Sequence, residues 1–444
     1  MQDLLDFFIY MDKKYFGLLI IFLLFISINE SLIIYSEDIT GGNNLKIEWI
    51  VKSNPSKRND YAYSICEDSN YIFVLGSENN NEQARIEKRL NEDGKLIKHW
   101  NLNLTVFNDL FTDCIILNDK LFVVGLFGSI WYYLILDLDL NLIKIQRGRT
   151  GFFEPNLILN YGNYLYISGK VKGYPENKWI VEKRDINLKM IKEYVSNLTD
   201  ITIGINPLTK NIWIVGYKKE EYKLKIEILD NDLNYLKTIY TEKFTNSYNL
   251  ITFNKEGYAY VATTSGYLVK FDKNGNLVKN PDKITFGGRI IISKILAIEN
   301  YIFLVSQLIN PEGIINHVII VLDEEFQEIK RLTVATNVMT FVDKGKIVNN
   351  RTRIYSIGNY YKSNNDSEWV IYSLNLTSFI TKIASDDYQY WIFHALIFSL
   401  LIISGAILWM LLKIRKLNKT YFFISFANLD LKIKVLKCLK EHYF

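Results

Sequence analysis

A short apolar strand that ends in a small residue recurs seven times along the chain. The seven strands end at Gly76, Gly125, Gly169, Gly216, Thr263, Ser306 and Gly358. Successive ends are separated by 43 to 52 residues. Repeats of about 40 to 50 residues with alternating apolar positions are typical of the four-stranded blades of β-propellers.

Each of these strands is followed by a polar loop and a second alternating strand. That strand ends in a turn containing Asp or Asn and continues into an apolar segment with a lysine, as in RIEKRLNEDGKLIK at 85–98 and VKFDKNGNLVK at 269–279. Asp and Asn favour tight turns because their side chains hydrogen-bond the backbone and tolerate left-handed conformations. One further apolar strand precedes each small-residue strand, as at 61–68. Each repeat therefore predicts a meander of strands A, B, C and D.

A single sheet of this kind would expose two apolar faces, whereas radial stacking buries each sheet between two neighbours. We therefore predict an all-β fold, a β-propeller of seven four-stranded blades over residues 44–383. Several open β-sandwich domains are the alternative. Small residues at the end of strand B suit a close approach between backbones.

A propeller must join its first and last blades, because an unpaired blade leaves a sheet edge exposed. The segment NLKIEWIVK at 44–52 precedes strand A of the first blade just as residues 96–104 precede strand A of the second. We expect this N-terminal segment to form the outer strand of the last blade. The competing interpretation is that FITKI at 379–383 completes that blade.

Two apolar segments flank the repeats. Residues 391–412 are 22 residues with a single ionisable group, His394, and a helix of that length reaches about 33 Å, enough to span a bilayer. Asp386 and Asp387 precede it in the linker 384–390 and four basic residues follow within 413–419, so the positive-inside rule places the tail 413–444 in the cytoplasm. A buried core helix is the alternative.

Near the N-terminus, Lys13 and Lys14 precede the apolar run 16–28. Its length suits a signal peptide, and extension by 32–35 would suit an uncleaved signal anchor, so residues 1–36 carry one or the other. Met11 is an alternative start. Both apolar segments predict an integral protein of the cell membrane with the propeller outside.

The amino-acid composition argues against several classes of function. The net charge is +4, but basic and acidic residues are interspersed, which argues against a nucleic-acid partner. Three Cys and four His in no zinc spacing predict no metal site, and no catalytic set or cofactor motif is evident.

Two runs have the 1, 3, 5 spacing of a calcium loop. In the run 272–276, Leu277 stands where that loop needs Gly and Lys283 where it needs a bidentate Glu. We interpret this run, and the similar run 137–141, as hairpin turns.

Cys66 and Cys114 occupy nearly the same place in neighbouring repeats. An oxidising exterior would allow a disulfide between them. We favour two buried thiols instead, because a bridge requires Cα atoms within about 7 Å. Cys438, in the predicted cytoplasmic tail, is expected to be reduced.

Glycosylation is a second modification that the exterior placement allows. Five N-x-S/T acceptor sequences lie in the repeat region, at Asn103, Asn197, Asn350, Asn365 and Asn375.

The blade pattern, G/N-x-aromatic-apolar-apolar-G followed by a D-x-x-G/N turn, resembles the seven-bladed propeller repeats of secreted prokaryotic proteins. It is more distantly similar to NHL-type and WD-repeat blades. The resemblance covers about residues 45–383 and implies an architecture without an activity. The chain lacks the Gly-His and Trp-Asp pairs of WD repeats and the S-x-D-x-G-x-x-W box of sialidase-like propellers.

The loops between strands B and C vary most, and variable loops on a rigid scaffold usually carry binding residues. The candidate binding residues are Tyr174 and Glu176 in the loop 170–178 and Tyr360 and Tyr361 in the loop 359–367. We predict a membrane-anchored extracellular module that binds or scaffolds a protein or glycan. An extracellular hydrolase, lyase or quinoprotein-like enzyme and a sensor ectodomain are the alternatives.

Overall fold

The structure is a computed structural model. It describes residues 46–376 except 106–107, 151–154, 172–177, 219–222, 242–248, 285–287, 337–346, 350–352 and 364–365, together with Ser399, Ser404 and Lys434. The predicted signal segment lies outside the described residues, as do nearly all of the predicted transmembrane helix and tail. Among the described residues no helix is long and apolar enough to cross a membrane.

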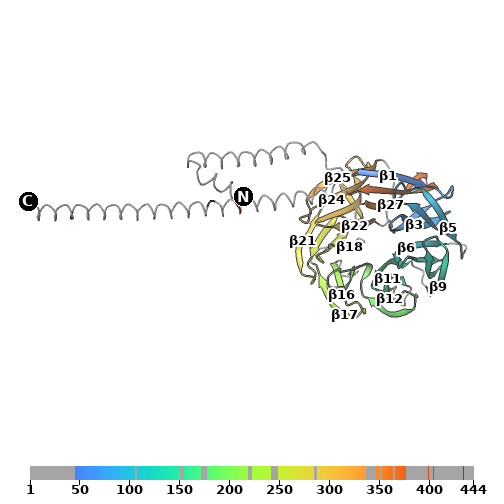
Figure 1. Cartoon of the computed structure of the whole chain (residues 1–444), viewed down its shortest axis with the longest axis horizontal. Coiled ribbons are helices and arrows are strands. Elements are labelled where there is room, and N and C mark those ends of the chain that lie inside the picture. The colour runs from blue at the N-terminus through green and yellow to red at the C-terminus, as the bar shows by residue number, and fades with distance from the viewer. Residues whose placement is uncertain are drawn as a thin grey trace, which may run out of the picture. The chain divides into compact units, whose positions relative to one another are not determined.

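The described strands form seven four-stranded antiparallel sheets arranged in a ring (Figure 1). Blades one to three are β2 (Tyr61–Glu67), β3 (Tyr71–Glu78), β4 (Gln83–Leu90) and β5 (Leu96–Leu102); β6 (Asp109–Leu117), β7 (Lys120–Phe127), β8 (Ile130–Asp137) and β9 (Leu142–Thr150); and β10 (Pro155–Tyr161), β11 (Tyr164–Val171), β12 (Lys178–Asp185) and β13 (Met190–Ser196). Blades four and five are β14 (Thr199–Ile205), β15 (Ile212–Lys218), β16 (Lys223–Leu229) and β17 (Tyr235–Tyr240); and β18 (Asn249–Phe253), β19 (Ala259–Thr263), β20 (Tyr267–Phe271) and β21 (Leu277–Lys283). Blade six is β22 (Arg289–Ile298), β23 (Tyr301–Ile309), β24 (Ile315–Leu322) and β25 (Glu328–Thr336), and blade seven is β26 (Ile347–Asn349), β27 (Arg353–Ser363), β28 (Asp366–Asn375) and β1 (Lys46–Ser53).

The predicted seven-bladed propeller is therefore confirmed, with strands A to D in meander order in the first six blades. Strands B and C are buried almost throughout, as in β3 and β4, whereas strand D is open to solvent along its first half, as in β5. Strands A of adjacent blades contact one another, as β2 and β6 do. Strand A is thus innermost and strand D forms the rim.

The ring is closed by the first strand of the described chain. β1 pairs antiparallel with β28, from Lys46 opposite Asn375 to Ser53 opposite Trp369. The N-terminal segment is the outer strand of blade seven, as predicted from its position before the first blade. The rival segment 379–383 lies outside the described residues.

The small residue at the end of strand B allows blades to approach closely. A Cβ added to Gly76 would overlap the carbonyl oxygen of Tyr61 on its own blade and lie 2.8 Å from the ring of Trp369 on blade seven. A Cβ on Gly169 would likewise lie 2.5 Å from the ring of Trp131 on blade two. At these two junctions a tryptophan of the preceding blade therefore fills the space that the glycine leaves.

Gly76→Val should lower the free energy of unfolding by more than about 3 kcal/mol, because a branched side chain must displace backbone as well as Trp369. Chemical denaturation of the full chain measures the effect. Gly313→Ala is the control: its Cβ would meet nothing within 4 Å, although φ is +81°, so it should lower stability by only about 1 kcal/mol. Equal losses of stability in the two variants would show that close packing around Gly76 does not contribute to the stability of the propeller.

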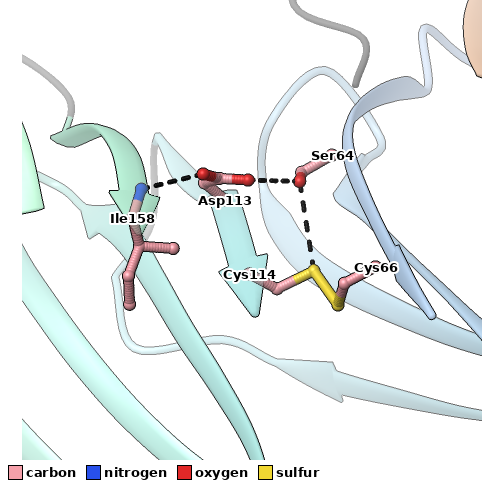
Figure 2. Close-up of a disulfide and its surroundings, with 5 residues drawn as sticks. All are labelled: Ser64, Cys66, Asp113, Cys114 and Ile158. Carbon is pink, nitrogen blue, oxygen red and sulfur yellow. Dashed lines mark hydrogen bonds between the residues drawn. A yellow bond between two sulfur atoms is a disulfide. The ribbon is translucent and has the colours of Figure 1, made fainter. Parts of the chain in front are cut away.

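A disulfide joins the inner strands of blades one and two (Figure 2). The Cα atoms of Cys66 on β2 and Cys114 on β6 are 6.0 Å apart, within the range of a bridge. Our preference for two reduced thiols was therefore wrong, because adjacent strands A approach more closely than spacing along the sequence indicates.

The disulfide lies beside a polar link that spans three blades. The Asp113 carboxylate accepts a hydrogen bond of 2.5 Å from Ser64 Oγ in blade one and one of 2.8 Å from the Ile158 backbone N–H in blade three. Figure 2 shows Asp113 between these two partners. Blades one to three are thus joined by covalent and polar contacts at their inner strands.

The denatured, unreduced full chain should contain one reactive thiol, that of Cys438, and three after reduction. Replacing Cys66 and Cys114 with Ala should lower the free energy of unfolding by about 4 kcal/mol, because the bridge closes a long loop in the unfolded chain. Thiol titration and denaturant unfolding check the two results. Three reactive thiols before reduction would contradict the pairing.

Candidate functional site

The propeller has two dissimilar ends. We call the end formed by the A–B and C–D turns the turn face and the opposite end, formed by the D–A and B–C loops, the loop face. The C–D turns are 91–95, 138–141, 186–189, 230–234, 272–276 and 323–327, and the A–B turns are 68–70, 118–119, 162–163, 206–211, 254–258 and 299–300. The described loops include 54–60, 79–82, 128–129, 264–266 and 310–314.

The C–D turns of blades two to six share one construction. Asp137 accepts hydrogen bonds from the backbone N–H groups of Asp139 and Asn141 and from the Asn141 side chain, at 2.8 to 2.9 Å. Desolvation is the largest single influence and opposes ionisation, but these hydrogen bonds together outweigh it and lower the pKa of Asp137. Asp230 and Asp272 make the same three bonds and also have a lowered pKa. These acids therefore hold the turns and are not available to a ligand.

In blades two to four, a leucine with positive φ fixes the C–D turn to the core. Leu140, Leu188 and Leu233 have φ between 59° and 69° and are buried. A left-handed leucine costs about 1–2 kcal/mol in backbone strain, which burial of its side chain, worth about 1.5–3 kcal/mol, offsets. The side chain thus holds the turn against the core.

Lysines of the preceding blade bind the turn oxygens. Lys88 Nζ lies 2.7 Å from a carboxylate oxygen of Asp139, and Lys98 Nζ lies 2.5 Å from its carbonyl oxygen. Lys144 and Lys237 donate similarly to the carbonyls of Asn187 and Asn274. Ammonium groups therefore neutralise oxygens that a calcium ion would need. The hairpin interpretation of 137–141 and 272–276 is confirmed, and no group of three potential metal ligands occurs among the described residues.

The loop face is built differently where blades seven, one and two meet. Asp60 accepts hydrogen bonds from the backbone N–H and hydroxyl of Ser56 and from the N–H of Asn79, at 2.6 to 3.0 Å. Burial is the strongest influence and raises the pKa of Asp60, although these hydrogen bonds act in the opposite direction. Ser367 of blade seven donates to the Asp60 carbonyl. One carboxylate thus joins a D–A loop to a B–C loop.

The B–C loop of blade one has an uncommon backbone. Asn79, Asn80 and Asn81 have φ of 57°, 60° and 66° in succession, a conformation that Asn tolerates better than most residues. The loop is held by the Asn80 N–H, which donates to the Asn59 carbonyl, and by Asn81, which accepts from Tyr63 Oη. The Asn80 side chain is exposed. The loop is therefore a fixed projection on this face.

The four candidate binding residues are not brought together as a described site. Tyr174 and Glu176 lie outside the described residues. Tyr360 and Tyr361 belong to strand β27, which runs to Ser363, so our assignment of 359–367 to a loop was wrong. The β27–β28 hairpin is long because β27 continues to pair with β28 as far as Ser363, with one irregularity between Tyr361 and Ser363.

Tyr360 also has an intramolecular partner. Lys52 Nζ lies 4.0 Å from the centre of the Tyr360 ring and 2.8 Å from Oε1 of Glu368. A cation over an aromatic ring contributes about 0.5–1 kcal/mol at a partly exposed site. Tyr360 therefore helps to hold the closing strand, and its replacement would affect stability as well as binding.

The glycosylation candidates fall into three groups. Asn103 and Asn197 are exposed in D–A loops on the loop face. Asn375 is half-buried and its side-chain amide donates to Glu48 at 2.8 Å, so a glycan there would break a contact of the closing strand. Asn350 and Asn365 lie outside the described residues.

The two histidines of the propeller do not form a catalytic set. His317 is buried against Tyr372, with 3.3 Å between Nε2 and Oη, and burial lowers its pKa to about 4. It is neutral at physiological pH and links blades six and seven. His99 lies on the outer strand of blade one, and desolvation lowers its pKa.

One acid near the turn face has an unusual environment. A side-chain oxygen of Glu67, at the end of β2, is buried without a hydrogen-bond partner among the described residues. Desolvation, and secondarily the charge of Asp68, raises its pKa from 4.5 to about 8. Nothing in the sequence around Glu67 predicted this, since an acid beside a turn is usually solvated.

The raised pKa of Glu67 predicts a pH dependence of stability. The folded state retains a proton that the unfolded state releases above pH 4.5, so this contribution is complete below about pH 4.5 and is lost as the pH rises towards 8. Glu67→Gln should flatten the fall in the free energy of unfolding across that interval. Denaturant unfolding at several pH values checks it, and parallel profiles of variant and parent would refute the assignment.

Comparison with known proteins finds similarity at the level of solved structures. BamB from Moraxella catarrhalis aligns at a TM-score of 0.43 and 13% identity over 70% of this chain and 84% of its own. The Dos1 propeller aligns at 0.47 and 9% over 75% and 95%, and a hydrazine synthase chain from Kuenenia stuttgartiensis at 0.45 and 11% over 60% and 84%. No protein-family model and no curated protein matches the chain. At these values the comparisons assign no function.

Proposed function

We propose that the protein is a membrane-anchored propeller on the outer side of the cell membrane that binds a protein or glycan through its loop face. The seven-bladed scaffold is described above. Its anchoring, its placement outside and its partner are the proposal.

The observation that carries the proposal is the direction in which the chain enters and leaves the propeller. β1 begins at Lys46, and Lys46 pairs with Asn375, the last residue of β28. Since strand C runs towards the turn face and strand D away from it, both chain ends leave at the turn face. Beyond the C-terminal end lies the apolar segment 391–412, which has the length and flanking charges of a membrane helix. Beyond the N-terminal end lies the shorter apolar run 16–28, which would be a second tether if it is extended by 32–35 and left uncleaved. Such tethers would leave the loop face free.

The construction of the two faces supports the same assignment. On the turn face, the polar groups of the C–D turns are used by one another and by lysines of neighbouring blades. The loop face carries loops of different lengths and the fixed projection at Asn80. Variable loops on a rigid scaffold are a common place for recognition.

The binding prediction compares matched positions on the two faces. A photoreactive benzoylphenylalanine at Asn80 of the cell-expressed full chain should yield a discrete cross-linked partner, and the same group at Asn274 should not. Both side chains are exposed, so accessibility alone does not separate them.

A second prediction concerns binding to a glycan and polysaccharide panel. The double variant Tyr174→Ala, Glu176→Ala should weaken binding at least tenfold, while the free energy of unfolding changes by no more than about 0.5 kcal/mol.

The Asn274→Ala variant is the control in the panel, because its turn contacts use only backbone atoms. Loss of binding in Asn274→Ala but not in the loop variants would place recognition on the turn face. Turnover of any panel member by the purified full chain would favour the enzyme alternative over a binding module.

A further inference from the structure

Exposed apolar side chains recur along the turn face. Of the 18 exposed large hydrophobic residues among those described, 13 lie in the A–B and C–D turns or within two residues of them. Contiguous apolar patches on soluble surfaces usually mark an interaction site.

Most of these residues repeat at one position. In blades one to five, the first two residues of strand D are large and apolar, with exposures that run from 38% at Leu96 to 55% at Tyr235. We call the first two residues of β5, β9, β13, β17 and β21 the apolar belt. A lysine follows each pair, and those of β5, β9, β17 and β21 donate to a turn carbonyl of the next blade. These lysines are thus engaged with the neighbouring turn.

The belt adjoins the point where both chain ends leave. The last described propeller residue is Leu376, and the predicted transmembrane helix begins at Trp391. The intervening 14 residues, 377–390, can span at most about 50 Å when extended. A helix anchored in the bilayer would therefore hold the end of β28, at the turn face, within about 50 Å of the lipid surface.

We propose that the turn face rests on the outer surface of the lipid bilayer, with the apolar belt among the lipid headgroups. The inference depends on the membrane anchoring proposed above. A belt that follows the rim over five consecutive blades fits a broad, flat partner, which can contact many blades at once.

The charged residues near the apolar belt indicate which lipid headgroup the turn face should contact. Exposed acids of the C–D turns, such as Asp139 and Asp232 with side chains 77% and 68% exposed, occur beside exposed lysines such as Lys189 and Lys273. The mixture gives no strong preference for anionic lipid. Contact with zwitterionic phosphatidylcholine is therefore expected, driven by the apolar side chains.

The test uses pairs of labels on one strand. In the full chain with Cys438→Ser and the Cys66–Cys114 disulfide intact, one cysteine introduced at Ile191 or at Val195 is the only free thiol and carries a fluorescent bimane. Both are exposed residues of β13, and the strand places them about 13 Å apart, with Ile191 nearer the turn face. In phosphatidylcholine vesicles containing a headgroup nitroxide lipid, quenching at Ile191 should exceed that at Val195 at least threefold. Val278 and Asp282 on β21 repeat the comparison.

The outcomes separate this inference from the proposed function. If the protein does not float with the vesicles, anchoring fails and the inference fails with it. Flotation with equal or absent quenching at Ile191 and Val278 leaves the anchor intact and overturns the lipid contact. A label at Ile191 that is protected from aqueous iodide but is not quenched by the nitroxide lipid would point to a second copy of the chain as the partner, if the protection increases with the density of protein in the vesicles. That result also overturns the lipid contact. Stronger quenching at Asn80 than at Ile191 reverses the orientation and refutes both proposals.

Discussion

The pairing of β1 with β28 is the constraint on which the ring depends. Each blade buries its two faces against neighbours, so a blade without its outer strand would weaken two interfaces. β1 also contributes side chains to both sides: Glu48 accepts from Arg353, Ser373 and Asn375 within blade seven. Towards blade one, Ser53 donates to the buried Glu87, and Trp49 donates to the Asn91 carbonyl. One strand therefore secures the junction of the last blade with the first.

Buried charges join the blades in a repeated way. Glu87-Lys88-Arg89 in blade one and Glu182-Lys183-Arg184 in blade three occupy the same place on strand C. Each glutamate accepts from its own arginine and from the outer strand of the preceding blade, and each lysine reaches the next C–D turn. Since a buried charge is tolerated only when it is paired, these contacts fix the order and spacing of the blades. Because the lysines bind the C–D turns, these contacts also restrict the conformation of the turn face.

The sequence predicted those features that depend on local patterns. The period of the small-residue strands set the blade count, and the Asp-x-Asp/Asn-x-Asn spacing set the turns. Features that depend on neighbours in space were missed: the approach of Cys66 to Cys114, the lysines that bind the turns and the buried oxygen of Glu67. Tyr360 and Tyr361 were placed in a loop because polar residues interrupt the pattern there, whereas pairing with β28 extends the strand.

The closing strand has a consequence for biosynthesis. β1 leaves the ribosome before every other strand of the propeller, and its partner β28 is made last. During translation of the 312 residues between Ser53 and Asp366, the edge of β1 has no partner in its own blade. Unpaired strand edges are open to association with other chains. The Cys66–Cys114 bridge, within the first two blades to emerge, can hold that part of the ring together while the chain awaits completion.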